Sequence, residues 1–145
     1  MFFASCMGLG LIPFMPGTIT SLAGGIIFYL IGKSPFFPII TILITLLSFI
    51  ISYIAYSHVK DDLPSITVDE LSGMLIAYTF HNPTILTIIA GFILFRLFDI
   101  LKPFPVRYFD NIKGGFGIMM DDIVAGILTS LLLFIPEILW HGQPL

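Results

Sequence analysis

Acidic residues occur as neighbouring pairs at the start of apolar segments of this chain. Asp69-Glu70 and Asp121-Asp122 each precede an apolar run, and Asp99 lies near the end of another. One acid at a helix N-terminus interacts favourably with the helix dipole by about 0.3–1 kcal/mol. That effect does not account for two pairs, and it disfavours Asp99, which lies at the opposite end of its segment. We therefore interpret all five acids as candidate ligands of a cation.

Carboxylates without imidazole or thiolate neighbours favour a hard divalent cation. Mg²⁺ usually binds one or two carboxylates together with waters and substrate phosphate. The histidines His58, His81 and His141 are far apart in the chain, and the one cysteine, Cys6, has no partner for a pair. Neither a zinc site nor a Ser-His-Asp triad is indicated. We predict Mg²⁺ as the cofactor, bound by Asp69, Glu70, Asp99, Asp121 and Asp122, the last four of which we expect to act in catalysis.

Basic residues lie close to Asp99 in the sequence. Arg96, Asp99 and Lys102 are three residues apart and share one face of a helix. The spacing fits a local ladder of ion pairs, and it also fits a cationic pair that holds a phosphate beside a metal-binding carboxylate. Pro103 follows Lys102 and ends the helix. Arg107 adds positive charge beyond it, so Arg96, Lys102 and Arg107 are the predicted phosphate-binding cations.

The chain as a whole is strongly apolar. It has 145 residues, of which 57% are hydrophobic and 10% charged, and its mean hydropathy is +1.06. A typical globular chain is about 25% charged. An integral membrane protein fits these values better than the alternative, a soluble helical protein that hides its apolar surface in an oligomer. We expect one membrane-embedded domain over residues 1–145.

Proline and glycine clusters divide the apolar sequence into helices. Residues 37–56 match the roughly 20 apolar residues that cross a bilayer. His81-Asn82-Pro83 interrupts residues 69–98, which predicts a short helical hairpin of residues 69–80 and 84–98. The alternative is a single span over residues 71–95. The predicted fold is all-α: a polytopic helical bundle of about four to five apolar helices that includes this hairpin.

The hairpin places nearly all charges at one face of the membrane. Residues 58–70 hold five charges and residues 96–122 hold eight, together 13 of the 15 in the chain. Five of the six basic residues are among them, and the positive-inside rule assigns such a face to the cytoplasm. Each arm of the hairpin is shorter than a bilayer, so we expect it to be partly re-entrant or sheltered by neighbouring helices.

Three segments resemble the signature blocks of the phosphatidylglycerophosphatase A family. They are "GLGLIPFMPGT" (8–18), "VDELSGM" (68–74) and "FRLFDILKPFPVRYFDNIKGGFGIMMDDIVAGI" (95–127). The resemblance implies a Mg²⁺-dependent lipid phosphatase of the bacterial inner membrane, which converts phosphatidylglycerophosphate to phosphatidylglycerol and phosphate. It also implies that Thr18 and Ser21 contact phosphate, although Ile19-Thr20 stand where the family usually has an aromatic residue and a glycine.

The expected reaction is attack of water on the terminal phosphate monoester at the cytoplasmic membrane face, assisted by Mg²⁺. An aspartyl-phosphate intermediate is also compatible with the sequence. The alternative function is a small cation transporter or channel subunit that uses the same carboxylates. The expected partners are the phospholipid substrate and the bilayer, with no nucleic acid, and a homo-oligomer is compatible with the sequence.

Overall fold

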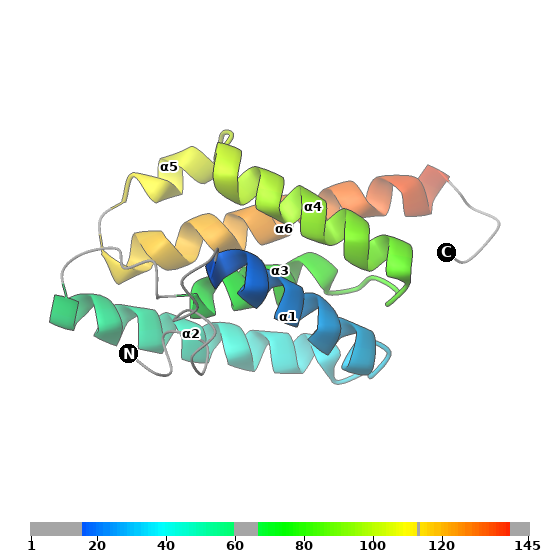
Figure 1. Cartoon of the computed structure of the whole chain (residues 1–145), viewed down its shortest axis with the longest axis horizontal. Coiled ribbons are helices and arrows are strands. Elements are labelled where there is room, and N and C mark those ends of the chain that lie inside the picture. The colour runs from blue at the N-terminus through cyan, green and yellow to red at the C-terminus, as the bar shows by residue number, and fades with distance from the viewer. Residues whose placement is uncertain (1–15, 60–66, 113, 140–145) are drawn as a thin grey trace.

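A computed structural model describes residues 16–59, 67–112 and 114–139. This part of the chain is helical throughout, with no strand, which confirms the all-α prediction (Figure 1). Its elements are α1 (Pro16–Ile31), α2 (Phe37–Val59), α3 (Val68–Tyr78), α4 (Ile85–Leu101), α5 (Val106–Asp110) and α6 (Gly115–Leu139). The cluster of prolines and glycines in residues 8–18 predicts a loop, but Pro16–Thr18 form the first turn of α1; residues 8–15 and Lys113 lie outside the described residues.

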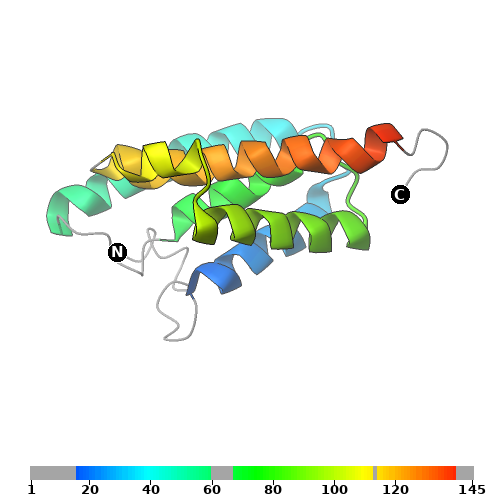
Figure 2. The ribbon, with the colours of Figure 1, turned by 90° about the horizontal axis from the view of Figure 1, so that it is seen from above.

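Helices α3 and α4 form the predicted hairpin. They run in opposite directions in both views of the ribbon (Figures 1 and 2). Phe80, with a φ of 74°, turns the chain after α3. Thr84 caps α4, because its side-chain oxygen accepts a hydrogen bond from the Thr87 backbone N–H at 3.1 Å. The hairpin therefore returns the charged end of α4 to the charged start of α3.

Helix α3 is the centre of the bundle. It contacts α1, α2, α4 and α6, and Met74, Leu75 and Tyr78 on it are fully buried. Phe28 of α1 stacks on Tyr78 with the ring centroids 4.5 Å apart. The Tyr78 hydroxyl donates to the Ile88 carbonyl of α4 at 2.7 Å. A helix too short to cross a bilayer is thus enclosed by its neighbours, as the sequence predicted.

Two glycines let α3 and α6 cross closely. A Cβ on Gly126 would overlap the Gly73 carbonyl, and a Cβ on Gly73 would lie 2.6 Å from the Asp122 carbonyl. Gly73 comes four residues after Asp69, and Gly126 four residues after Asp122. Each acid therefore lies about one helical turn from the crossing, on the same side of it. The crossing brings the two acid pairs of the sequence together.

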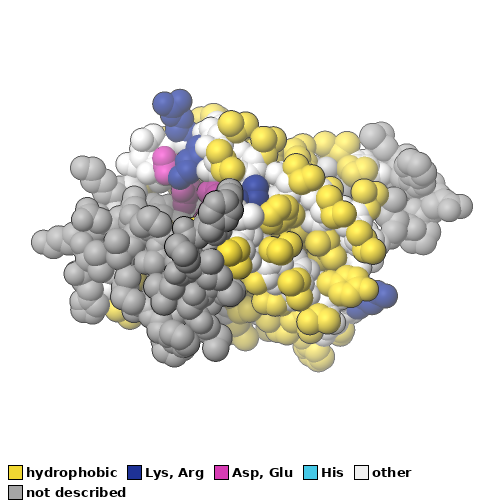
Figure 3. All heavy atoms as spheres, viewed as in Figure 1, with side chains coloured by type: hydrophobic (Ala, Val, Ile, Leu, Met, Phe, Trp, Pro, Cys, Tyr) yellow, Lys and Arg dark blue, Asp and Glu magenta, His cyan; other side chains and the backbone are white. Residues whose placement is uncertain are grey.

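Much of the described face in Figure 3 is apolar, and large hydrophobic side chains of α1, α2, α4 and α6 are exposed. Within the described residues, two segments are long and apolar enough to cross a membrane, namely Phe37–Ala55 of α2 and Gly115–Pro136 of α6. The predicted four to five apolar helices thus include two of spanning length. Helices α1, α3 and α4 have 16, 11 and 17 residues and are shorter than a hydrocarbon core about 30 Å thick.

Helix α6 begins earlier than the sequence indicated. The glycine-rich segment 113–117 is typical of a turn, yet Gly115 and Gly117 are helical. Gly115 lies against the α2 backbone, where an added Cβ would come within 2.7 Å of the Tyr53 Cα. Close packing against α2 therefore accounts for helical glycines at this position, and only Gly114, with a φ of 106°, takes a left-handed conformation.

Candidate active site

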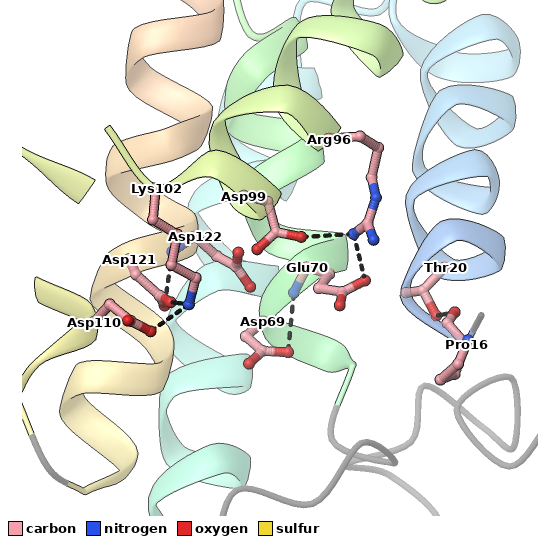
Figure 4. Close-up of polar contacts among 10 residues, drawn as sticks. All are labelled: Pro16, Thr20, Asp69, Glu70, Arg96, Asp99, Lys102, Asp110, Asp121 and Asp122. Carbon is pink, nitrogen blue, oxygen red and sulfur yellow. Dashed lines mark hydrogen bonds and ion pairs between the residues drawn. The ribbon is translucent and has the colours of Figure 1, made fainter. Parts of the chain in front are cut away.

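The predicted acids converge at one end of the bundle (Figure 4). Asp69 and Glu70 lie in the first turn of α3. Asp121 and Asp122 come six and seven residues after the first residue of α6, so the dipole at the start of a helix does not explain their position. Asp69 and Asp122 are each only 4% exposed, and Asp121 is 7% exposed. Buried carboxylates of this kind require partners or a bound cation.

Arg96 links two of the helices at this end. Its Nη1 atom lies 2.7 Å from Oδ2 of Asp99, on the same helix, and 3.4 Å from Oε2 of Glu70 on α3. The first half of the predicted ladder, Arg96 with Asp99, is present, whereas Lys102 pairs with other acids because it leaves the helical conformation at the C-cap of α4. The guanidinium has five N–H donors, so these two contacts leave donors for a phosphate.

Lys102 forms a second ionic group beside the first. Its Nζ atom lies 2.8 Å from Oδ2 of Asp121 and also contacts Oδ1 of Asp110, at the end of α5 (Figure 4). Lys102 is the C-cap of α4 and has a φ of 44°, in the left-handed region. That region is uncommon for a residue with a Cβ, so packing and these ion pairs must hold the backbone there.

Negative charge exceeds positive charge in this cluster. Burial raises the pKa of Glu70 to about 7; the Arg96 guanidinium lowers it, whereas the carboxylates of Asp99 and Asp121 raise it. Burial and the adjacent Glu70 carboxylate raise the pKa of Asp69 well above its usual range. Bringing more carboxylates together than cations is the pattern expected of a cation site.

The donor set fits Mg²⁺ in its chemistry. Within the described part of the chain, no three His, Cys, Asp or Glu side chains are placed together as a preformed metal cage. Mg²⁺ does not require such a cage, because it commonly binds one or two carboxylates and completes its shell with water and substrate phosphate. The acids at this end supply oxygen ligands only, which excludes the softer thiolate and imidazole sites.

Three predicted phosphate contacts make no polar contact with the acids within the described residues. Thr18 is half-buried in the first turn of α1, and Arg107 is exposed on α5. Ser21 is fully buried, and its hydroxyl has no hydrogen-bond partner among the described residues. None of the three has a polar contact with the acids in the described part of the chain. Their role in binding phosphate stays a prediction.

Sequence reasoning missed two features of the site. Asp110 shares Lys102 with Asp121, but the break in the helix after Lys102 hides this pairing from any helical spacing. Gly17, in the first turn of α1, lies so close to the Glu70 carboxylate that an added Cβ would overlap it. A signal for Gly17 was present in its position between Pro16 and Thr18, in a segment that resembles a family signature.

Fold and site together define an all-helical protein with a buried group of acids and bases at one end of an apolar bundle. The phosphatidylglycerophosphatase A family model matches residues 2–137, and the chain belongs to this family. It is 38% identical over 144 residues to phosphatidylglycerophosphatase A of Escherichia coli, covering 95% of this chain and 81% of that protein. It is 41% identical over 136 residues to phosphatidylglycerophosphatase A of Haemophilus influenzae, covering 88% and 82%.

A third relative carries a different name. A putative phosphatidylinositol-3-phosphatase of Bacteroides thetaiotaomicron is 35% identical over 136 residues, covering 87% of this chain and 86% of that protein. No solved structure matches the chain. All three relatives are thus named as phosphatases of a phosphatidyl lipid, and the third name differs from the other two in the head group.

Proposed function

We propose that this protein is a phosphatidylglycerophosphatase. It hydrolyses the terminal phosphate monoester of phosphatidylglycerophosphate and gives phosphatidylglycerol and inorganic phosphate. The observation that carries this proposal is the convergence of five acids with Arg96 and Lys102 at one end of an apolar bundle, in a chain whose family bears this activity in its name. An apolar exterior beside this group suits a substrate whose tails stay in the bilayer.

Arg96 and Lys102 bind and orient the phosphate in this proposal. The Arg96 guanidinium is planar and can present two parallel N–H groups to two phosphoryl oxygens. Lys102 adds a point charge from the other side of Asp99. Both cations interact most strongly with the phosphoryl oxygens in the transition state, where negative charge builds up on them. An interaction that is stronger in the transition state than with the bound substrate accelerates the reaction.

Carboxylates of the cluster would hold Mg²⁺. We assign this role to Asp69, Glu70, Asp99, Asp121 and Asp122, whose burial and mutual repulsion favour a bound cation. Bound Mg²⁺ supplies neutralisation of the phosphate charge and increases the acidity of a nearby water.

The same set of acids would also handle protons, through a member that is not directly bound to the ion. A carboxylate of Glu70, Asp99, Asp121 or Asp122 accepts a proton from the attacking water, the oxygen of that water bonds to phosphorus, and the bond from phosphorus to the glycerol oxygen breaks. The leaving glycerol oxygen takes up a proton to become the alcohol. Attack by an aspartate instead of water is the alternative that trapping of a phosphoenzyme would reveal.

The membrane placement follows from the same arrangement. We propose that the protein is a multi-pass protein of the bacterial inner membrane, that residues 1–145 form one domain, and that the acid end faces the cytoplasm. Helices α2 and α6 have spanning length, and the described basic residues other than Lys33 lie at the acid end of the bundle, Arg96 and Lys102 among the acids and Arg107 on α5 (Figures 1 and 4). The comparisons give no support to the alternative of a cation transporter.

Phosphate release by the purified protein tests the proposal. The protein in detergent is assayed with phosphatidylglycerophosphate, in Mg²⁺ and in EDTA, beside phosphatidylinositol 3-phosphate at equal concentration. Asp99→Asn is the site variant, because it keeps the side-chain volume and removes the charge that faces Arg96. Lys33→Gln is the charge-removing control, since Lys33 is exposed in the connection between α1 and α2, which lies at the other end of the bundle (Figure 1).

We expect release from phosphatidylglycerophosphate that requires Mg²⁺, falls by at least 10²-fold in Asp99→Asn and is unchanged in Lys33→Gln, as when one transition-state contact is lost. Preferred release from phosphatidylinositol 3-phosphate would refute the head-group assignment and leave the phosphatase class intact. A folded wild-type protein that releases phosphate from neither lipid would contradict the proposal.

A further inference from the structure

An apolar pocket lies away from the acid end of the bundle. It has a volume of about 260 Å³ and is formed by the first turns of α2, the end of α3 and the middle of α6. Helix α3 connects the two regions, since it begins with the acids and ends beside the pocket. From Glu70 to Thr79, which lines the pocket, the nine-residue rise is about 13 Å. The proposed phosphate chemistry does not use this pocket.

The pocket opens on the outer surface of the bundle. Ile42 of α2 is 59% exposed, Leu131 of α6 is 58% exposed and Phe80, after α3, is 76% exposed. The two helices that flank it are the two with spanning length. In the proposed membrane placement, the opening therefore faces lipid hydrocarbon rather than water.

One polar group in the pocket has no hydrogen-bond partner among the described residues. Three hydroxyls line it: that of Ser130 pairs with Nε2 of His81 at 3.0 Å, and that of Thr79 donates to the Leu75 carbonyl at 2.9 Å. Thr41 is 3% exposed, and within the described residues its hydroxyl makes no hydrogen bond. An unpaired buried hydroxyl is unfavourable, so an acceptor supplied by a ligand would satisfy it.

We propose that this pocket binds one acyl chain of a membrane phospholipid, and that the ester carbonyl of this chain accepts a hydrogen bond from the Thr41 hydroxyl. Thr41 lies four residues, about 6 Å, inside the first residue of α2. The spanning segment Phe37–Ala55 begins at the edge of the hydrocarbon core, so an ester group bound to Thr41 would lie about one helical turn inside that edge. The inference rests on the proposed membrane placement and does not depend on the phosphatase reaction.

Photochemical labelling in a defined bilayer tests this site. The full chain is placed in nanodiscs of a dialkyl ether phosphatidylcholine, which has no ester carbonyl, with a small fraction of an ester phosphatidylcholine that carries a diazirine on its acyl chain. After irradiation, mass spectrometry locates the label. We expect saturable labelling near Ile42 and Leu131, which unlabelled ester lipid displaces and further ether lipid does not.

Three variants separate a specific site from general contact with lipid. Thr41→Val keeps the shape and removes the hydroxyl, and we expect an about five-fold weaker apparent affinity, as for one lost hydrogen bond. Ser48→Ala is the matched control, because Ser48 lies on the same helix, is 1% exposed and has an unpaired hydroxyl in the described part, but does not line the pocket. Ile127→Trp fills the pocket and should abolish the labelling.

Two results would overturn the proposal. One is labelling spread evenly over the outer faces of α2 and α6 that unlabelled ester lipid does not displace. The other is an equal effect of Thr41→Val and Ser48→Ala, since the pocket hydroxyl would then have no special role. Phosphate release is measured in the same nanodiscs, so that loss of the site and failure of the proposed enzyme activity are observed separately.

Discussion

Arg96 is the residue on which the phosphate site depends most directly. One of its nitrogens contacts carboxylates from two helices, Glu70 and Asp99. Arg96→Lys keeps the charge and loses the planar pair of donors. We expect kcat/KM for phosphate release to fall about 10–100-fold, the loss of one charge-assisted hydrogen bond. Lys33→Arg, at an exposed position between α1 and α2, should change it less than two-fold, and equal losses in both variants would contradict the assignment.

Asp110 should act through Lys102 rather than on the substrate. Both Asp110 and Asp121 contact the Lys102 ammonium, so Asp110→Asn leaves the ammonium to Asp121 alone. We expect an about five- to ten-fold lower kcat/KM, recovered in Asp110→Glu. In a double-mutant cycle with Lys102→Gln, the Asp110 substitution should add little. Additive losses would show that Asp110 has a separate role.

At the level of single residues, most of the charged cluster could be predicted from the sequence. Adjacent acid pairs and the spacing of Arg96, Asp99 and Lys102 are local patterns, and the fold brings these residues together as expected. Asp110 was not predicted, because its position depends on how the chain turns between α4 and α5. The proximity of Gly17 to Glu70 depends on the packing of α1 against α3, which a single sequence does not show.

The crossing of α3 and α6 sets the distance between the acid pairs. Gly126→Ala would place a Cβ against the Gly73 carbonyl, and backbone cannot yield as a side chain does. We expect the helices to separate, a loss of about 1–3 kcal/mol of stability and at least a ten-fold loss of phosphate release. Thermal unfolding in detergent and initial rates measure both effects.

Gly25→Ala is the matched control for this crossing. Its Cβ would lie 3.3 Å from Cγ2 of Ile88, the end of a side chain that can move. We expect nearly unchanged rates and an unfolding temperature close to that of the wild type. If Gly25→Ala and Gly126→Ala lowered activity equally, close approach at the crossing would not be what positions the acids.

The elements were predictable to different degrees. The hairpin was predicted from Pro83 and the polar residues before it, and the structure confirms it. The start of α6 was not, because glycines at residues 114–117 are typical of a turn unless neighbouring backbone packs against them. Here Gly115 lies against α2 and stays helical. Contacts with residues distant in the sequence determine the conformation of a segment whose own preference for helix or turn is weak.

Over the whole molecule, opposite ends of the bundle should lie on opposite sides of the membrane. We replace Cys6 by serine and introduce either Lys33→Cys or Tyr108→Cys, both at exposed positions. With a membrane-impermeant maleimide on intact spheroplasts, we expect labelling at position 33 only. Position 108 should react after permeabilisation, because it lies at the acid end assigned to the cytoplasm. Labelling at both positions in intact spheroplasts would refute this orientation.

Composition predicted the class of molecule, and the structure agrees with it. Many large hydrophobic side chains are exposed on the described helices, which the low fraction of charged residues indicated. The number of membrane crossings could not be predicted with the same certainty. Helices of 11 to 17 residues are enclosed or tilted according to their neighbours, and hydropathy alone does not distinguish these cases.

The four-residue interval from acid to glycine has a consequence for insertions and deletions. It occurs in α3, from Asp69 to Gly73, and in α6, from Asp122 to Gly126, and each glycine is fixed against the other helix. One added residue inside either interval would rotate the acid by about 100° around its helix and turn it away from the site. The length of the connection of residues 79–84 does not determine the direction in which either acid points. Homologous chains should therefore vary in length between α3 and α4, and never between an acid and its glycine.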